Sequence, residues 1–148
     1  MTHSAHSNAS HSSLPGLGVI IMAAGLGKRM KSAVAKVLHP VAGRPMVLYV
    51  VDIASRLAEQ GVAVVVGHQG ADVRKVVEGA GAHVAVAEQT RQLGTGHAVL
   101  QARPVFAGQP QRKPSRYLIL NGDTPLLTEA TVRELLAMHD AQGAAVTL

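Results

Sequence analysis

The chain has 148 residues, of which 47% are hydrophobic, chiefly alanine, valine and leucine, and only 2% are aromatic. This length suits one ordinary domain, and small aliphatic side chains favour helices packed on a buried parallel sheet over an aromatic-rich β-sandwich. The chain has no cysteine, which excludes disulfides, a thiolate nucleophile and cysteine-ligated zinc and is compatible with a cytoplasmic location.

The net charge of +5 does not by itself indicate nucleic-acid binding. A single-strand-binding surface interleaves basic residues with stacking aromatic side chains, whereas the densest basic group here is Lys28, Arg29 and Lys31 in one glycine-rich loop. The longest apolar runs are far too short to cross a membrane. We therefore expect neither a nucleic acid nor a membrane as a partner.

Residues 1–16 form a polar leader in which serine, histidine, asparagine and alanine dominate. The leader lacks the apolar core of a secretory signal peptide, and its composition is typical of disorder. The irregular spacing of His3, His6 and His11 favours a solvated tail over a metal site. We expect the fold to occupy residues 17–148.

After the leader, apolar strands alternate with amphipathic helices. Strands are expected at 18–23, Val62–Gly67, His83–Gln89 and Arg116–Asp123, with another beginning at 144; helices are expected at 44–61, 71–79, 94–102 and 128–143. Thr131 and Glu134 have the spacing of a capping box. This order predicts the α/β class, with a Rossmann-like, mostly parallel sheet and helices on both of its faces.

The stretch GVIIMAAGLGKRMKS, residues 18–32, carries the first strand into a loop with two glycines and three basic residues. It is not a Walker A loop, because Met22 and Arg29 stand where that loop needs a glycine and a hydroxyl. It is not a dinucleotide fingerprint, because Met30 replaces the third glycine and no acidic residue follows about twenty positions on. Backbone N–H groups of the loop, with Arg29 and the later Lys36, favour a phosphate site over a basic surface turn.

Residues 22–46, MAAGLGKRMKSAVAKVLHPVAGRPM, resemble the signature of the sugar-phosphate nucleotidyltransferases, roughly L-A-A-G-x-G-x-R-M followed by P-K. With EQTRQLGTGHA and LILNGDTPLL further on, the chain is similar to the N-terminal, MobA-like NTP transferase domain of bacterial bifunctional UDP-N-acetylglucosamine pyrophosphorylases and glucosamine-1-phosphate N-acetyltransferases. The similarity runs from Val19 to about Leu127 and covers only the first part of such a domain. It implies the nucleotide-diphospho-sugar transferase fold in incomplete form.

The resemblance implies a binding role for each matching position. The nucleotide-binding set is Ala23, Ala24, Gly25, Gly27, Gln89, Gly94, Thr95 and Gly122. The backbone of residues 23–25 borders uracil and ribose, and the Gln89 amide, which both donates and accepts hydrogen bonds, recognises the base. His97, on the helix after LGTG, is expected to pack or to face solvent rather than to act as a catalyst.

Two basic residues and a carboxylate are implied to act on the phosphates. Arg29 contacts the β- and γ-phosphates that leave as pyrophosphate, Lys36 binds near the α-phosphate, and Asp123 ligates Mg²⁺. Asp123 also ends an expected parallel strand, where ligands bind in open α/β sheets, although a helix-capping aspartate fits this position equally well. In two departures from the family pattern, Ala35 replaces the usual proline before Lys36, and Lys28 replaces a small hydroxyl residue.

The implied reaction is attack by N-acetylglucosamine 1-phosphate on the α-phosphorus of UTP, which yields pyrophosphate and UDP-N-acetylglucosamine for peptidoglycan and lipopolysaccharide synthesis. We expect the present chain to keep the nucleotide site but to turn over little alone. A full-length member is expected to be a homotrimer through its C-terminal domain. Two alternatives stay open: a related sugar-phosphate or molybdenum-cofactor nucleotidyltransferase, and a non-catalytic nucleotide-binding module.

Overall fold

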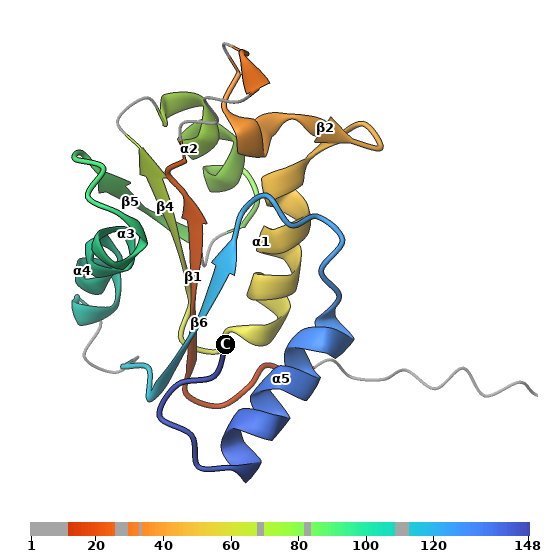
Figure 1. The fold of residues 1–148 in the computed structure, drawn as a ribbon, viewed down its shortest axis with the longest axis vertical. Coiled ribbons are helices and arrows are strands. Elements are labelled where there is room, and N and C mark those ends of the chain that lie inside the picture. The colour runs from red at the N-terminus through yellow and green to blue at the C-terminus, as the bar shows by residue number, and fades with distance from the viewer. Residues whose placement is uncertain (1–11, 26–29, 33, 68–69, 82–83, 109–112) are drawn as a thin grey trace, which may run out of the picture.

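The computed structural model describes residues 12–25, 30–32, 34–67, 70–81, 84–108 and 113–148 (Figure 1). A four-stranded, wholly parallel sheet has the spatial order β5-β4-β1-β6. Its strands are β1 (Leu17–Ala23), β4 (Val62–Gly67), β5 (Val84–Gln89) and β6 (Arg116–Asn121). The chain moves outward from β1 through β4 to β5 and then crosses to the other side of β1. This reversal of direction makes the carboxyl edge beside β1 the usual place for a ligand in such sheets.

β1 is the central strand because its sequence is apolar on both faces. Val19 pairs with Val62 of β4 on one side and with Leu118 of β6 on the other. Its side chains alternate between two separate clusters, with Val19 and Ile21 in one and Ile20 in the other. A strand that is covered on both faces and paired along both edges needs an unbroken apolar run, and LGVIIMA supplies it.

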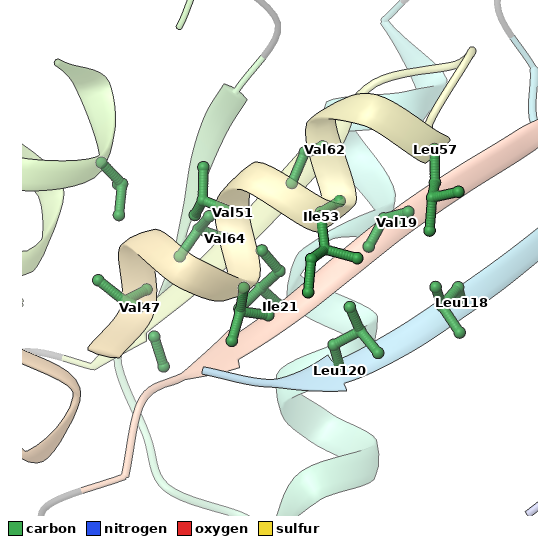
Figure 2. Packing of buried hydrophobic residues seen from close by; sticks show 14 of the residues in the cluster. Val19, Ile21, Val47, Val51, Ile53, Leu57, Val62, Val64, Leu118 and Leu120 are labelled. Carbon is green, nitrogen blue, oxygen red and sulfur yellow. The ribbon is translucent and has the colours of Figure 1, made fainter. Parts of the chain in front are cut away.

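The larger cluster lies between the sheet and three helices, α1 (Met46–Leu57), α2 (Ala71–Glu78) and α5 (Glu129–Ala141). Figure 2 shows Val47, Val51 and Leu57 of α1 pointing onto β1, β4 and β6. The smaller cluster lies on the opposite face, under α3 (Thr95–Gln101) and α4 (Arg103–Ala107). The predicted parallel sheet with helices on both faces is confirmed.

A short 3-10 helix, η2 (Lys36–Leu38), and a hairpin of β2 (Pro40–Val41) and β3 (Arg44–Pro45) join β1 to α1. The hairpin turns through Ala42 and Gly43, both at positive φ, as a two-residue hairpin turn requires. Arg44 anchors it to α1 by two hydrogen bonds of 2.7 and 2.9 Å to the Asp52 carboxylate. That bonding raises the pKa of Arg44 above its ordinary value. None of these three short elements was expected from the sequence.

One cap and one strand were predicted wrongly, and one helix was not predicted. Thr128, not Thr131, caps α5: its hydroxyl oxygen accepts the Thr131 N–H at 3.2 Å. The helix expected at 94–102 is confirmed as α3, but a second, unpredicted helix, α4, follows it, since Pro104 has no N–H with which to extend the hydrogen bonding of α3. The segment from 144 onward is not a strand, because its hydrogen bonds go to α5 instead of to the sheet: Ala144 N–H donates to the His139 carbonyl.

Part of the leader lies against the fold. Leu14 pairs with Ala58, and its N–H donates to the Leu57 carbonyl at 2.8 Å. The Gly16 N–H donates to the Glu59 carboxylate at 2.7 Å, which holds the pKa of Glu59 below its ordinary value. Residues 1–11, with the three leader histidines, are outside the described residues, so the division at residue 16 stays a prediction. Among the described helices, none has the length and apolar character needed to span a bilayer.

We expect Ile21→Ala to lower the free energy of unfolding by about 2–5 kcal/mol, because the fully buried side chain leaves a cavity under α1. Urea denaturation followed by circular dichroism measures the change. Leu126→Ala is the control: this side chain is 86% exposed, and its removal should change stability by less than about 0.5 kcal/mol. Equal decreases in the free energy of unfolding in the two variants would contradict the conclusion that β1 is the centre of the hydrophobic core.

Candidate functional site

Three strand ends and one loop enclose a cavity of about 410 Å³ at the carboxyl edge of the sheet. Its lining comes from the ends of β1, β5 and β6, from η2 and from the start of α3. The lining residues are Met22, Ala23, Ala24, Gly25, Lys36, Val37, Gln89, Gln92, Gly94, Thr95, Ala98, Asn121 and Asp123. The cavity therefore lies where open parallel sheets bind their ligands.

Most of the predicted site residues meet in this cavity. Those that line it are Ala23, Ala24, Gly25, Lys36, Gln89, Gly94, Thr95 and Asp123. Gly122 does not line it but lies directly behind, against β1 and η2. Gly27, Lys28 and Arg29 are outside the described residues, so the expected contact of Arg29 with phosphates stays a prediction.

Lys36 and Asp123, which both line the cavity, form an ion pair. The Lys36 Nζ lies 2.6 Å from Asp123 Oδ2, although 87 positions separate the two residues in the sequence (123 minus 36). Their side chains are 42% and 31% exposed, and an ion pair with this much solvent contact stabilises a fold by about 1 kcal/mol or less. Both groups can therefore exchange this partner for an incoming anion or cation at little cost in stability.

Gly122 permits the close approach that brings this pair together. Its N–H donates to the Met22 carbonyl at 3.0 Å, which holds the end of β6 against the end of β1. A Cβ built at Gly122 would lie 3.2 Å from that carbonyl oxygen and 3.4 Å from a methyl group of Val37 in η2. Gly122 thus acts as a packing position that sets the distance between Asp123 and Lys36.

Gln89 ends β5 inside the cavity wall and is only 4% exposed. Its Nε2 donates to the Gly94 carbonyl at 3.1 Å and lies 3.0 Å from Nδ1 of His97. The other ring nitrogen of His97 lies 3.1 Å from Nε2 of Gln101. Gly94 precedes α3 at a φ of 95°, a conformation that glycine adopts without strain. His97 therefore packs against the polar wall of the cavity. Packing was one of the two placements expected for it, and exposure to solvent was the other.

Sequence reasoning missed Gln92 and Asn121. The Gln92 side-chain amide donates to the Ala24 carbonyl at 2.8 Å, so the loop before α3 is tied to the loop after β1. Asn121 is the last residue of β6 and lines the cavity next to Asp123. Gln92 begins the motif QLGTG, and Asn121 begins the motif NGD. Their position inside these motifs could have indicated that they lie at the site.

The side chains that line the cavity can hold Mg²⁺ only together with oxygen atoms of a bound phosphate and of water. Within the described residues, no group of three or more histidine, aspartate or glutamate side chains is placed to hold a metal. Among the described lining residues, Asp123 alone supplies a carboxylate. Mg²⁺ keeps several waters and is commonly held by one or two carboxylates together with substrate phosphates, so a single aspartate in a cavity that can admit phosphates fits that ion.

The fold and cavity define a class of protein: a parallel α/β protein with a polar ligand site at the carboxyl ends of its strands. The family model described as the MobA-like NTP transferase domain matches residues 19–148. The chain therefore belongs to the family of MobA-like NTP transferase domains.

Curated relatives and solved structures agree with this family. The chain is 51% identical over 132 residues to the bifunctional protein GlmU of Pelobacter propionicus, covering 89% of this chain and 28% of that protein. It is 44% identical over 135 residues to the bifunctional protein GlmU of Thermoanaerobacter pseudethanolicus, covering 91% of this chain and 28% of that one. The chain thus spans about a quarter of the length of these relatives.

Among solved structures, a nucleotidyl transferase from Methanothermobacter superposes with a TM-score of 0.65 at 22% identity, covering 82% of this chain and 56% of that chain. The inositol-1-phosphate CTP transferase from T. maritima superposes with a TM-score of 0.59 at 22% identity, covering 72% and 43%. At these identities the likeness shows the fold, which is that of the nucleotidyltransferases.

We expect Gly122→Ala to lower the free energy of unfolding by about 1–3 kcal/mol, because the added methyl group meets the Met22 carbonyl, which the sheet holds in place. Gly25→Ala is the matched control, since a Cβ at Gly25 meets nothing within 4 Å and should change stability by less than about 0.5 kcal/mol. Thermal and urea unfolding of both variants check the difference. A Gly122→Ala chain as stable as the control would show that the contact is not tight.

Proposed function

We propose that the cavity binds UTP and forms the nucleotide half of a uridylyltransferase site that makes UDP-N-acetylglucosamine from UTP and N-acetylglucosamine 1-phosphate. The observation that carries the proposal is the meeting of Lys36, Asp123 and Gln89 in one cavity at the carboxyl edge of the sheet. The identity of about half the residues with GlmU proteins supports it, and the resemblance to UDP-N-acetylglucosamine pyrophosphorylases supplies its substrates.

The residues divide into a base-binding and a phosphate-binding part. Gln89, Gly94 and Thr95 form the wall near β5 and α3, and the buried amide of Gln89 suits the polar edge of a pyrimidine. Lys36 begins η2 and Asp123 follows the end of β6, where charged groups suit a triphosphate. Residues 23–25, at the end of β1 and in the loop that follows, line the cavity between the two parts. Their backbone groups are available to the ribose and phosphates.

The proposed reaction needs alignment and charge neutralisation rather than a strong base. The attacking phosphate oxygen is already anionic at neutral pH, so the protein must bring two anions together in line. In the proposal, Lys36 leaves Asp123 and places its ammonium group on the α-phosphate, where it neutralises charge that develops during transfer. Asp123 would hold Mg²⁺, which supplies further neutralisation of the triphosphate charge.

The first test is equilibrium binding of UTP to the 148-residue chain by isothermal titration calorimetry, with and without Mg²⁺. We expect UTP to bind in the presence of Mg²⁺ and more weakly without it, because the carboxylate of Asp123 otherwise faces the phosphates without a bridging cation. Failure of the chain to bind UTP under any of these conditions would contradict the proposal. Parallel titrations with ATP, GTP, CTP and dTTP distinguish uridylyl transfer from the related nucleotidyltransferase activities.

In a chain extended to the complete domain, we expect Lys36→Ala and Asp123→Asn each to lower turnover by about 10²–10³-fold, because each removes a charge directed at the reacting phosphates. Release of pyrophosphate from UTP and N-acetylglucosamine 1-phosphate is the measurement. Lys75→Ala, which removes an exposed lysine of α2 that does not line the cavity, is the control and should keep normal turnover. Turnover near the control value in either site variant would remove that residue from the mechanism. A domain that binds UTP but releases no pyrophosphate would favour the non-catalytic nucleotide-binding module.

A further inference from the structure

Gln89 belongs to a hydrogen-bonded chain whose outer members take no part in the proposed function. From the cavity outward it runs through the Gln89 amide, the His97 ring and the Gln101 amide, with contacts of 3.0 and 3.1 Å. His97 and Gln101 are four positions apart on α3, so they lie on one face of that helix. Because Gln89 is 4% exposed, these neighbours rather than water decide the orientation of its amide.

The chemistry of the partners allows only one orientation of the Gln89 amide. The Gly94 carbonyl can only accept a hydrogen bond, so the NH₂ group of Gln89 must face it, as it does at 3.1 Å. The same nitrogen lies 3.0 Å from Nδ1 of His97, and since an NH₂ group can only donate, Nδ1 must accept its second hydrogen. The ring hydrogen of His97 is then on Nε2, where the half-buried Gln101 can accept it by turning its amide oxygen toward the ring.

This arrangement leaves the oxygen as the free polar atom of Gln89. Both amide hydrogens are taken by Gly94 and His97, and among the described residues no hydrogen bond is found to Oε1. A ligand in the cavity therefore meets an acceptor. Uracil carries an N–H donor at N3, whereas cytosine placed in the same way carries a lone pair there and is repelled.

We propose that His97, held by Gln101, is a positioning residue that keeps the oxygen of Gln89 directed to the cavity and so makes the site prefer uracil over cytosine. The inference rests on the proposed function, since it presumes that Gln89 meets the base. His97 does not itself line the cavity, so it acts through Gln89. Without His97, the second N–H of Gln89 loses its acceptor, and the amide becomes free to turn its NH₂ group toward a cytosine.

The test compares UTP with CTP in Mg²⁺-dependent binding to the 148-residue chain and to three variants of His97. We expect His97→Ala to reduce the preference for UTP about tenfold, since one directed hydrogen bond to the base is lost. His97→Asn should keep most of the preference, because the oxygen of asparagine takes the place of Nδ1, whereas the longer side chain of His97→Gln should not restore it. His139→Ala, which removes a ring on α5 that contacts the Thr147 hydroxyl, is the control and should bind like the wild type.

Two further measurements separate positioning from a general structural effect. In a Gln89→Ala background, His97→Ala should change the preference no further, because the residue through which it acts is missing. In the unliganded wild-type chain, nitrogen NMR of labelled histidine should find the hydrogen of His97 on Nε2. This second result needs no variant to fold.

The outcomes distinguish the two proposals. If the wild type prefers UTP and a folded His97→Ala chain keeps that preference, the inference is wrong and the proposed function stands. A hydrogen on Nδ1 of His97 would likewise overturn the inference alone. If the wild type binds UTP and CTP equally, the inference is wrong; if it binds neither, the proposed function fails and the inference fails with it.

Discussion

The burial of β1, in which every residue but Met22 is buried, is the constraint on which the rest of the structure depends. Its side chains enter two clusters on opposite faces, and its backbone is paired with β4 on one edge and β6 on the other. Because both faces and both edges of β1 are occupied by other elements, the strand can contribute to a ligand site only at its carboxyl end. There it enters the glycine-rich segment, so the same apolar run that stabilises the core also delivers the loop to the site.

The cavity is assembled from segments that are distant in the sequence and are joined by few contacts. Gln92 ties the loop before α3 to the carbonyl of Ala24, and the N–H of Gly122 ties the end of β6 to the carbonyl of Met22. Both contacts use the backbone that follows or ends β1 as their acceptor. The cavity is thus organised around a fixed strand end, while the Lys36–Asp123 pair in its lining is solvated enough to open.

The two walls of the cavity differ in their electrostatic character, and this difference suits a nucleotide. Near β5 and α3 the polar groups are the buried amide of Gln89 and the half-buried side chains of His97 and Gln101, whose orientation is determined by mutual hydrogen bonding. Near η2 and β6 the groups are charged and partly exposed. A neutral base is recognised best by polar groups whose orientation is fixed. Phosphates and their cations need charged side chains that can move to meet them.

Much of the fold could be predicted because its signals are local. β4 has the predicted bounds, Val62–Gly67, since an apolar run between Gly61 and His68 fits only a buried strand. The cap of α5 was misplaced by three residues, because Thr128 and Thr131 have similar side chains and only the helix geometry decides which hydroxyl meets a free N–H. The segment from 144 was misread, since an apolar sequence becomes a strand only where a neighbouring strand takes up its hydrogen bonds.

The sequence by itself determined the class of the fold, the alternation of its four main strands with helices along the chain and most of the residues that line the cavity, because hydrophobic periodicity and motifs are properties of neighbouring positions. Only the tertiary structure decided which of those residues meet: the pairing of Lys36 with Asp123, the approach of Gln92 to Ala24, and the contact of Gln89 with His97. These contacts are set by the parallel register of the strands and by the crossing from β5 to β6. Distances of this kind depend on how whole elements pack, and no short stretch of sequence contains that information.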